Sequence, residues 1–502
     1  MRNSRSLLAA GLSLLALSAC GGSAPSEEHG PVGRQYGRIA FQPCTLAAPY
    51  STINVEAQCA RFEVPENPQL PQGRKVALNI AWLPATNEGA ETADPVFFLA
   101  GGPGQSAVEV WPAIDGAFRD VRKLRHVVLV DQRGTGKSNP LACRDEHGKN
   151  AYGETQDTSA DAAVAFARRC AEQLQADPRF YTTTDAVRDL DAVRAALGAD
   201  KINLVGGSYG TRVAQQYAMR HPQHTRSLVL DGVVPNELVL GSEHARNLDE
   251  ALALQFKRCQ QAPACADKFG KDQREQLRAL MTRLSAQPVQ VEYRDPSTNQ
   301  TGSGQVDAGT VASLTRMFSY APQAAALLPL VLSEAEQGRY GPLMSLSKLL
   351  ENQLGEQFMH GMQLSVICTE DVDLLKDNAA DRDTVLGDTM NAYLKAQCAV
   401  WPTGSRPADF HAPLKSDVPT LLMSGEFDPV TPPRYGAQVE RHLRNGLHLV
   451  LKGQGHGSFG TGCVPKLLGR FIESADVKTV DAGCLESLDY VPPFTSFNGW
   501  EP

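Results

Sequence analysis

The stretch 202–222 constrains the fold more than any other part of the chain. An apolar run at 202–205 is followed by Gly206-Gly207-Ser208-Tyr209-Gly210 and then by a helical pattern at 211–221, which Pro222 ends. A buried strand that turns sharply into a helix requires small residues around the turn, because larger side chains would collide there. The pattern therefore predicts a nucleophile elbow, a turn that holds the Ser208 hydroxyl clear of the backbone.

Two further polar residues follow apolar strands late in the chain. Asp428 lies in Gly425-Glu426-Phe427-Asp428-Pro429, after a predicted strand at 419–424. His456 lies in Gly453-Gln454-Gly455-His456-Gly457, after a predicted strand at 447–451. Taken singly, an Asp before Pro is an ordinary turn former, and a His in a Gly-rich loop is an ordinary loop residue. The order Ser, Asp, His along the chain is that of α/β-hydrolases, and it predicts a Ser208–Asp428–His456 catalytic triad.

Strands and helices alternate over the first half of the chain. Early segments at 38–42, 61–64 and 75–83 alternate as exposed strands do, whereas 96–99, 127–130 and 227–230 are short apolar runs typical of buried strands. Helical patterns cover 160–174 and 184–197, with Thr184 as the expected N-cap of the second and Gly198 as its end. This alternation predicts an α/β fold of the α/β-hydrolase class, a mostly parallel sheet with helices on both faces.

The alternation stops at 236–415. Helical patterns dominate there, at 245–259, 272–285, 311–320, 324–337 and 343–354, with one strand-like patch at 289–293. The parallel-sheet pattern returns at Val418, just before Asp428. An insertion at this point of the chain predicts a mainly helical cap over the catalytic face. We therefore divide the chain into a core at 37–235 and 416–502 and a cap at 236–415.

The N-terminal residues have the features of an export signal. Arg2 and Arg5 precede an apolar run at 7–17 that is too short to span a membrane as a helix. Leu17-Ser18-Ala19-Cys20 resembles a bacterial lipobox, in which Cys20 becomes the lipidated first residue, and an ordinary secretory signal cut near Ala19 is the alternative. Both predict export. We expect a signal peptide at 1–19, a flexible tether at 20–36, and attachment to a membrane of the bacterial cell envelope through Cys20.

The cysteine content predicts disulfides, and the net charge argues against one class of binding partner. Setting Cys20 aside leaves ten of the 11 cysteines, an even number that indicates disulfides in an exported protein. Spacing does not fix their connectivity. No Cys-x-x-Cys pair or Cys/His cluster has the spacing of a metal site, so neither a metal nor a cofactor is expected. A formal charge of −8 without a basic cluster argues against nucleic acid as a partner. The simplest disulfide pairing joins neighbours along the chain: Cys44–Cys59, Cys143–Cys170, Cys259–Cys265, Cys368–Cys398 and Cys463–Cys484.

Acyl transfer through the predicted triad needs two N–H donors for the developing oxyanion. The backbone N–H of Tyr209 is one expected donor, because it directly follows Ser208. The turn Gly101-Gly102-Pro103-Gly104 follows the strand at 96–99 and can supply the other, for which Gly102 is our choice. The loop at 131–138 is not a phosphate loop, because its glycines lie too close to Lys137. We interpret it as a structural turn whose Arg133 pairs with a buried carboxylate.

These motifs together resemble those of the proline iminopeptidase and tripeptidyl aminopeptidase family of α/β-hydrolases. The resemblance spans about 97–463 and rests on Gly-Gly-Pro-Gly after a strand, Asp-Gln-Arg-Gly-x-Gly-x-Ser, the elbow, and the late Asp and His. The segment at 425–432 is similar to the C-terminal segment of the tripeptidyl aminopeptidase branch. The resemblance implies a serine exopeptidase that acts on peptide N-termini without a cofactor. Proline iminopeptidases usually carry His before Gly-Gly-Pro-Gly, and Ala100 at this position makes a preference for N-terminal proline less secure.

An aminopeptidase must bind the charged amine of its substrate, which a carboxylate in a partly closed pocket does well. Glu370 and Asp371 are the candidates, since they follow an apolar run at 364–367 within the predicted cap. A solvated helix cap is the alternative interpretation of this pair. A carboxylesterase of small esters is the alternative function, because the same triad hydrolyses both substrate classes. A binding protein built on a hydrolase scaffold would lack a member of the triad, and none is missing.

Overall fold

A ten-stranded sheet forms the centre of the computed structural model, which describes residues 33–47, 52–87, 89, 91–144, 148, 159–270, 272–354 and 357–498. The predicted signal peptide, Cys20 and most of the predicted tether lie outside these residues. The strand order is β1-β2-β3-β4-β6-β5-β7-β8-β11-β12, and β9 and β10 form a separate hairpin. The strands are β1 (Arg34–Tyr36), β2 (Ile39–Ala47), β3 (Asn54–Pro65), β4 (Lys75–Leu83), β5 (Val96–Leu99), β6 (Val127–Val130), β7 (Ile202–Gly207), β8 (Thr225–Asp231), β9 (Val289–Arg294), β10 (Thr301–Val306), β11 (Thr420–Gly425) and β12 (Gly446–Leu451).

The half of the sheet that carries the site is parallel. All neighbours from β6 to β12 run parallel, whereas β1 to β4 form an antiparallel extension that joins β6 through β4. Every residue of β5 and β6 is buried, because helices cover both faces of a parallel sheet and leave no position for polar side chains. The predicted α/β fold with a mostly parallel sheet is confirmed.

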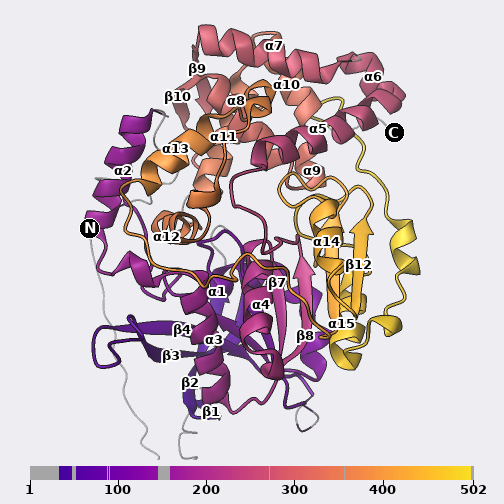
Figure 1. Cartoon of the computed structure of the whole chain (residues 1–502). Helices are drawn as coiled ribbons and strands as arrows, with labels where there is room; N and C mark the ends of the chain where they lie inside the picture. Colours follow the sequence, from indigo (N-terminus) through magenta and orange to yellow (C-terminus); the bar gives the residue numbers. More distant parts are fainter. Residues whose placement is uncertain are drawn as a thin grey trace, which may run out of the picture. The chain divides into compact units, whose positions relative to one another are not determined.

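Helices α3, α4 and α14 pack against one face of this sheet, and α1 and α15 pack against the other (Figure 1). Gly198 ends α3 in the left-handed conformation with a φ of 74°, as predicted. The N-cap predicted at Thr184 is wrong. Thr182 caps the helix instead, since only Thr182 has an acidic residue, Asp185, three positions later to complete a capping box. The helices outside the insertion are α1 (Ala107–Ile114), α2 (Ala160–Gln173), α3 (Thr183–Leu197), α4 (Tyr209–Arg220), α14 (Pro433–Glu440) and α15 (Val464–Ser474).

The chain between β8 and β11 is mainly helical, as predicted. The helix expected at 324–337 is split into α9 and α10, and Pro329 lies in the first turn of α10, where its missing N–H costs nothing. The strand expected at 289–293 is β9. Its partner β10 was not predicted, because Thr-Gly-Ser-Gly carries little β-strand signal. The helices are α5 (His244–Gln261), α6 (Pro263–Phe269), α7 (Gln273–Ala286), α8 (Ala308–Phe318), α9 (Pro322–Ala325), α10 (Leu328–Glu336), α11 (Gly341–Leu354), α12 (His360–Glu370) and α13 (Thr389–Cys398).

These helices form two groups with separate apolar cores. One core joins α5, α7, α8, α10 and α11 with the β9–β10 hairpin. The other joins α12 and α13 with α2, which comes from the first half of the chain, and it contains both Cys143–Cys170 and Cys368–Cys398 (Figure 1). Among the residues that the structure describes, no helix is both long enough and apolar enough to cross a membrane.

All five predicted disulfides are present in the predicted pairing of neighbouring cysteines. Five bridges indicate a protein that folds in an oxidising compartment outside the cytosol. Cys463–Cys484 ties the C-terminal segment to the start of α15. Beyond this bridge the segment reaches the helical insertion, where the Phe494 N–H donates to the Ala326 carbonyl at 2.9 Å and the Arg258 guanidinium lies 3.7 Å from the Tyr490 ring centroid.

Candidate active site

Ser208 occupies the turn between β7 and α4 in a conformation that few non-glycine residues adopt, with φ 53° and ψ −124°. Its backbone N–H donates to the Asp231 carbonyl at 2.8 Å, and its own carbonyl accepts from the N–H and hydroxyl of Thr211. A side chain at Gly206 would collide with the Gly210 carbonyl, and one at Gly210 would collide with the Leu99 carbonyl. The geometry is that of a nucleophile elbow, and its glycines are required for the reason predicted from the sequence.

Asp428 and His456 form a pair in which the carboxylate is fully buried and the imidazole is partly exposed. The His456 Nδ1 lies 2.8 Å from Asp428 Oδ2. The other carboxylate oxygen, Oδ1, accepts the N–H groups of Val430 and Thr431, both at 2.8 Å. The Thr431 hydroxyl donates to Oδ2 at 2.8 Å and lies 3.1 Å from the His456 Nδ1. These contacts hold Asp428 as an acceptor and direct Nδ1 of the imidazole toward it, leaving Nε2 for a substrate or nucleophile.

Electrostatics favour the charged form of both residues. Burial alone would raise the pKa of Asp428, but the charge and hydrogen bond of His456 and the N–H donors of Thr431 and Val430 hold it below its ordinary value. Burial alone would lower the pKa of His456, but Asp428, assisted by Asp231, raises it above its ordinary value. The pair therefore stabilises the imidazolium that forms when His456 accepts a proton.

Sheet topology brings the three predicted triad residues to one edge. Ser208 follows β7, Asp428 follows β11 and His456 follows β12, all at the carboxyl ends of parallel strands that lie in the order β7-β8-β11-β12. Gly232, just past the end of β8, leaves room for the His456 imidazole. A Cβ at this position would lie 3.0 Å from His456 Cε1.

The Gly101–Gly104 turn lies against Ser208. A Cβ at Gly101 would lie 3.0 Å from Ser208 Cβ. Gly102 has a φ of 105°, and the Gly104 carbonyl accepts the Met359 N–H at 3.1 Å, which joins the turn to the start of α12. Tyr209 is the first residue of α4, and N–H groups in a first helical turn have no partner within the helix. Of the expected donor residues, Gly102 thus follows the residue that lies against Ser208, and Tyr209 follows Ser208 itself.

Glu370 and Asp371, at the end of α12, are completely buried. Glu370 accepts the N–H of Thr183 at 2.6 Å and its hydroxyl at 2.8 Å, and that hydroxyl lies 2.6 Å from the Tyr209 hydroxyl. Asp371 forms an ion pair with Arg212 of α4 at 2.9 Å, and both side chains are inaccessible to solvent. Burial, together with the neighbouring charge of Asp371, raises the pKa of Glu370 to about 8. The alternative of a solvated helix cap is therefore wrong.

Residues of the helical insertion contact the loops of both Asp428 and His456. The Tyr320 carbonyl, just beyond α8, accepts the His456 N–H at 2.7 Å, and the two rings lie 5.2 Å apart edge to face. The Asn247 side chain of α5 donates to the Val430 carbonyl at 2.7 Å. The insertion therefore contacts both loops that carry the predicted acid and base.

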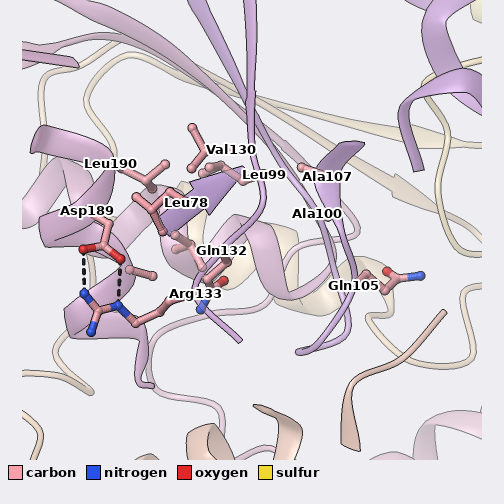
Figure 2. Close-up of a pocket in the computed structure, with 12 residues that line it drawn as sticks. Leu78, Leu99, Ala100, Gln105, Ala107, Val130, Gln132, Arg133, Asp189 and Leu190 are labelled. Carbon is pink, nitrogen blue, oxygen red and sulfur yellow. Dashed lines mark hydrogen bonds and ion pairs between the residues drawn. The ribbon is translucent and has the colours of Figure 1, made fainter. Parts of the chain in front are cut away.

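Arg133 pairs with a buried carboxylate, as predicted, through two hydrogen bonds of 2.7 Å to Asp189. Figure 2 shows this pair beside a small cavity whose wall includes Leu99, Ala100 and Gln132. Its volume of about 20 Å³ has room for roughly one water molecule. The cavity is too small for a peptide, and Arg133 also donates to the carbonyls of Glu66 and Phe180.

Two residues of the site were not identified from the sequence, Thr431 and Asp231. Asp231 follows an apolar strand and precedes a glycine, a pattern close to the one that marked Asp428. Thr431 follows Asp428 by three residues and has no separate signal, because its role depends on the fold of the loop around the carboxylate.

The sequence profile of the alpha/beta hydrolase fold family matches residues 94–462, and the chain belongs to this family. Serine protease Hip1 of Mycobacterium tuberculosis is 26% identical over 487 residues, covering 89% of this chain and 91% of the relative. Tripeptidyl aminopeptidase of Streptomyces lividans is 26% identical over 436 residues, covering 81% and 79%. Proline iminopeptidase of Neisseria gonorrhoeae is 33% identical over 140 residues, covering 28% and 32%. The predicted resemblance and the hydrolase class are confirmed.

Proposed function

We propose that this protein is a serine exopeptidase, an aminopeptidase that releases residues or short peptides from peptide N-termini. The observation that carries the proposal is the 2.8 Å contact between His456 and Asp428, at the same sheet edge as the Ser208 elbow. The relatives named serine protease and tripeptidyl aminopeptidase, which match over most of the chain, support peptides as the substrate class.

The proposed reaction is acyl transfer. His456 Nε2 accepts the Ser208 proton while Oγ attacks the scissile carbonyl, and the N–H groups of Tyr209 and Gly102 stabilise the tetrahedral oxyanion. When the intermediate collapses, the C–N bond breaks and the imidazolium protonates the leaving amine. Water, deprotonated by His456, then hydrolyses the acyl-enzyme and regenerates the serine. Asp428 orients the imidazole and stabilises its charge in both steps.

We assign binding of the substrate amine to the end of α12. Two buried carboxyl groups, Glu370 and Asp371, adjoin there, and Asp371 lies 2.9 Å from the Arg212 guanidinium and 3.7 Å from the His411 imidazole. Arg212 already pairs with Asp371, which leaves Glu370 for the ammonium. An ammonium beside Glu370 would favour its ionised form and offset the effect of burial. The Glu370–Thr183–Tyr209 hydrogen bonds connect this carboxylate to the residue that follows the nucleophile.

We further propose that the protein is exported and anchored by a lipid on Cys20, with the helical insertion at 236–415 acting as a cap. The five disulfides support an oxidising compartment. Radiolabelled palmitate should label the wild type and not Cys20→Ser. Equal labelling of both proteins would rule out Cys20 as the lipidation site.

A matched set of fluorogenic substrates tests the function. The set contains Pro-, Ala- and Ala-Ala-Pro-coumarin amides, each with a free and a blocked N-terminus, and a short-chain nitrophenyl ester. Cleavage of free amides but not of blocked ones supports an aminopeptidase, and the preferred length separates single-residue from tripeptide release. Cleavage of the ester alone would overturn the proposal in favour of a carboxylesterase. Fluorophosphonate labelling that persists in Ser208→Ala would exclude Ser208 as the nucleophile.

A further inference from the structure

Four adjacent strands end at the candidate site, and only three of them carry a member of the proposed triad. Strand β8 lies between β7, which leads to Ser208, and β11, which leads to Asp428. Its last residue, Asp231, is opposite Gly207 in β7 and opposite Met423 in β11. Asp231 is 2% exposed, so a carboxylate is buried at the middle of the catalytic edge.

Asp231 contacts both the elbow and the histidine loop. Its backbone carbonyl accepts the Ser208 N–H at 2.8 Å. Its carboxylate accepts the Ser458 hydroxyl through Oδ1 and the Ser458 N–H through Oδ2, both at 2.7 Å. Ser458 follows His456 by two residues. A single residue therefore links the backbone of the nucleophile to the loop that carries the proposed general base.

The loop at 453–458, which carries His456, is rich in glycine and therefore needs contacts from outside to hold one conformation. Gly453, Gly455 and Gly457 flank His456, and glycines leave a loop with the greatest conformational freedom. On the N-terminal side, the loop is held by the Tyr320 carbonyl at the His456 N–H. On the C-terminal side, Asp231 holds Ser458 by two hydrogen bonds. Burying a carboxylate lowers the stability of the folded protein. If this position served packing alone, an apolar residue would give a more stable fold.

We propose that Asp231 is a positioning residue of this enzyme, which sets the distance and angle between Ser208 and His456 by holding the Ser458 backbone and hydroxyl. The inference rests on the proposed function, because it concerns the same triad. Asp231 contacts neither substrate nor reacting atoms, and acts through Ser458 and the elbow.

The charge of Asp231 also affects the pKa of His456, which the pH profile of kcat/KM reports. Asp428 from the β11 loop, Asp231 from β8, His244 from α5 and the Tyr320 ring beyond α8 all face or neighbour His456. The two carboxylates raise the pKa of His456, whereas desolvation lowers the pKa of the half-buried His244 to about 3, so His244 stays neutral near pH 7. Burial raises the pKa of Asp231, and the two Ser458 donors and the His456 charge act against this rise. With Asp231 ionised, removing its charge should move the acid limb of kcat/KM to lower pH.

The test compares Asp231→Ala, Asp231→Asn and Ser458→Ala by kcat, KM and the rate of fluorophosphonate labelling per folded molecule. Asp231→Ala should lose about 10²-fold in kcat with little change in KM, because a misplaced base slows chemistry more than binding. Asp231→Asn can still accept the Ser458 N–H, and should recover much of this loss while shifting the acid limb. Ser458→Ala should have a smaller effect, and it should add nothing to Asp231→Ala in the double variant. Additive losses would overturn the linkage through Ser458.

Asp94→Asn is the matched control. Asp94 binds the Arg125 guanidinium and the Asn203 amide just before β5, at the opposite edge of the same sheet. The Asp94→Asn substitution should lower the melting temperature without changing kcat. Wild-type labelling and kcat in Asp231→Ala, with no labelling of Ser208→Ala, would overturn this inference alone. Labelling of Ser208→Ala would overturn the proposed function as well. If Asp231→Ala does not fold, Asp231→Asn and Ser458→Ala still decide, since wild-type kcat and pH profile in both would contradict the proposal.

Discussion

Glu370 accepts hydrogen bonds from both the backbone N–H and the hydroxyl of Thr183, at 2.6 and 2.8 Å. This contact joins the end of α12 to the first turn of α3. Through the Thr183 hydroxyl it continues to Tyr209, the residue after Ser208. A buried carboxyl group thus links the helical insertion to the turn that carries Ser208.

Stability should depend on pH through Glu370. Its pKa rises to about 8 in the folded protein, through burial and the charge of Asp371. A raised folded pKa favours the protonated folded state, so this stabilisation is complete below the unfolded pKa of about 4.3 and is lost as pH rises toward 8. Glu370→Gln resembles the protonated form. The melting temperature of Glu370→Gln relative to wild type should therefore rise between pH 5 and pH 8 in a thermal shift assay. The same substitution at exposed Glu486 should give a constant difference, and a constant difference at Glu370 would contradict the assignment.

Substrate discrimination should also depend on Glu370. If its carboxylate binds the substrate ammonium, Glu370→Gln should raise KM for free-amine peptides by roughly tenfold or more, the cost of one charge-assisted hydrogen bond. KM for N-blocked or ester substrates should change little, because these lack the ammonium. Michaelis–Menten measurements on matched free and blocked amides make the comparison. An equal rise for both substrate types would mean that Glu370 only supports the fold.

Thr431 should be required for efficient catalysis. Its hydroxyl donates to Asp428 Oδ2 at 2.8 Å, so Thr431→Val leaves the carboxylate without one of its donors. A hydrogen bond to a charged group contributes about 1.5–3 kcal/mol, and kcat should fall roughly 10- to 100-fold. Thr431→Ser keeps the hydroxyl and should retain most of the activity. Identical kcat values for the Val and Ser variants would show that the methyl group, not the hydroxyl, matters.

The pH profile should report the Asp428–His456 pair. The general base must be neutral, so kcat/KM should rise with pH through the His456 pKa. This pKa is raised above its ordinary value of 6.5, and the midpoint of the acid limb should lie above 6.5. In Asp428→Asn the residual activity should titrate at lower pH, since the main charge that raises the pKa is gone. An unchanged midpoint in Asp428→Asn would exclude His456 as the titrating base.

Local sequence patterns predicted the bounds of those strands in which every residue is buried. The strands at 96–99 and 127–130 have the predicted bounds, because every residue in them is buried and the apolar run is the strand. Helix α12 was recognised only as an apolar run at 364–367. It is buried on nearly all sides, so it lacks the amphipathic period that marks a surface helix. Strand β10 was missed because its stability comes from pairing with β9.

The sequence by itself determined the class of fold, the elbow at Ser208 and the order of Asp428 and His456, because each depends on a short run of residues and on the alternation of strands and helices. The sequence offered the pairing of neighbouring cysteines as the simplest one without fixing it, and the structure has this pairing. Only the tertiary structure decided that Glu370 bonds Thr183, that Asp371 pairs with Arg212 and that Asp231 holds the histidine loop. These contacts join residues between 159 and 227 positions apart, and no local pattern encodes them. Their partners meet only when α12 packs against α3 and α4 and when the end of β8 meets the loop after β12.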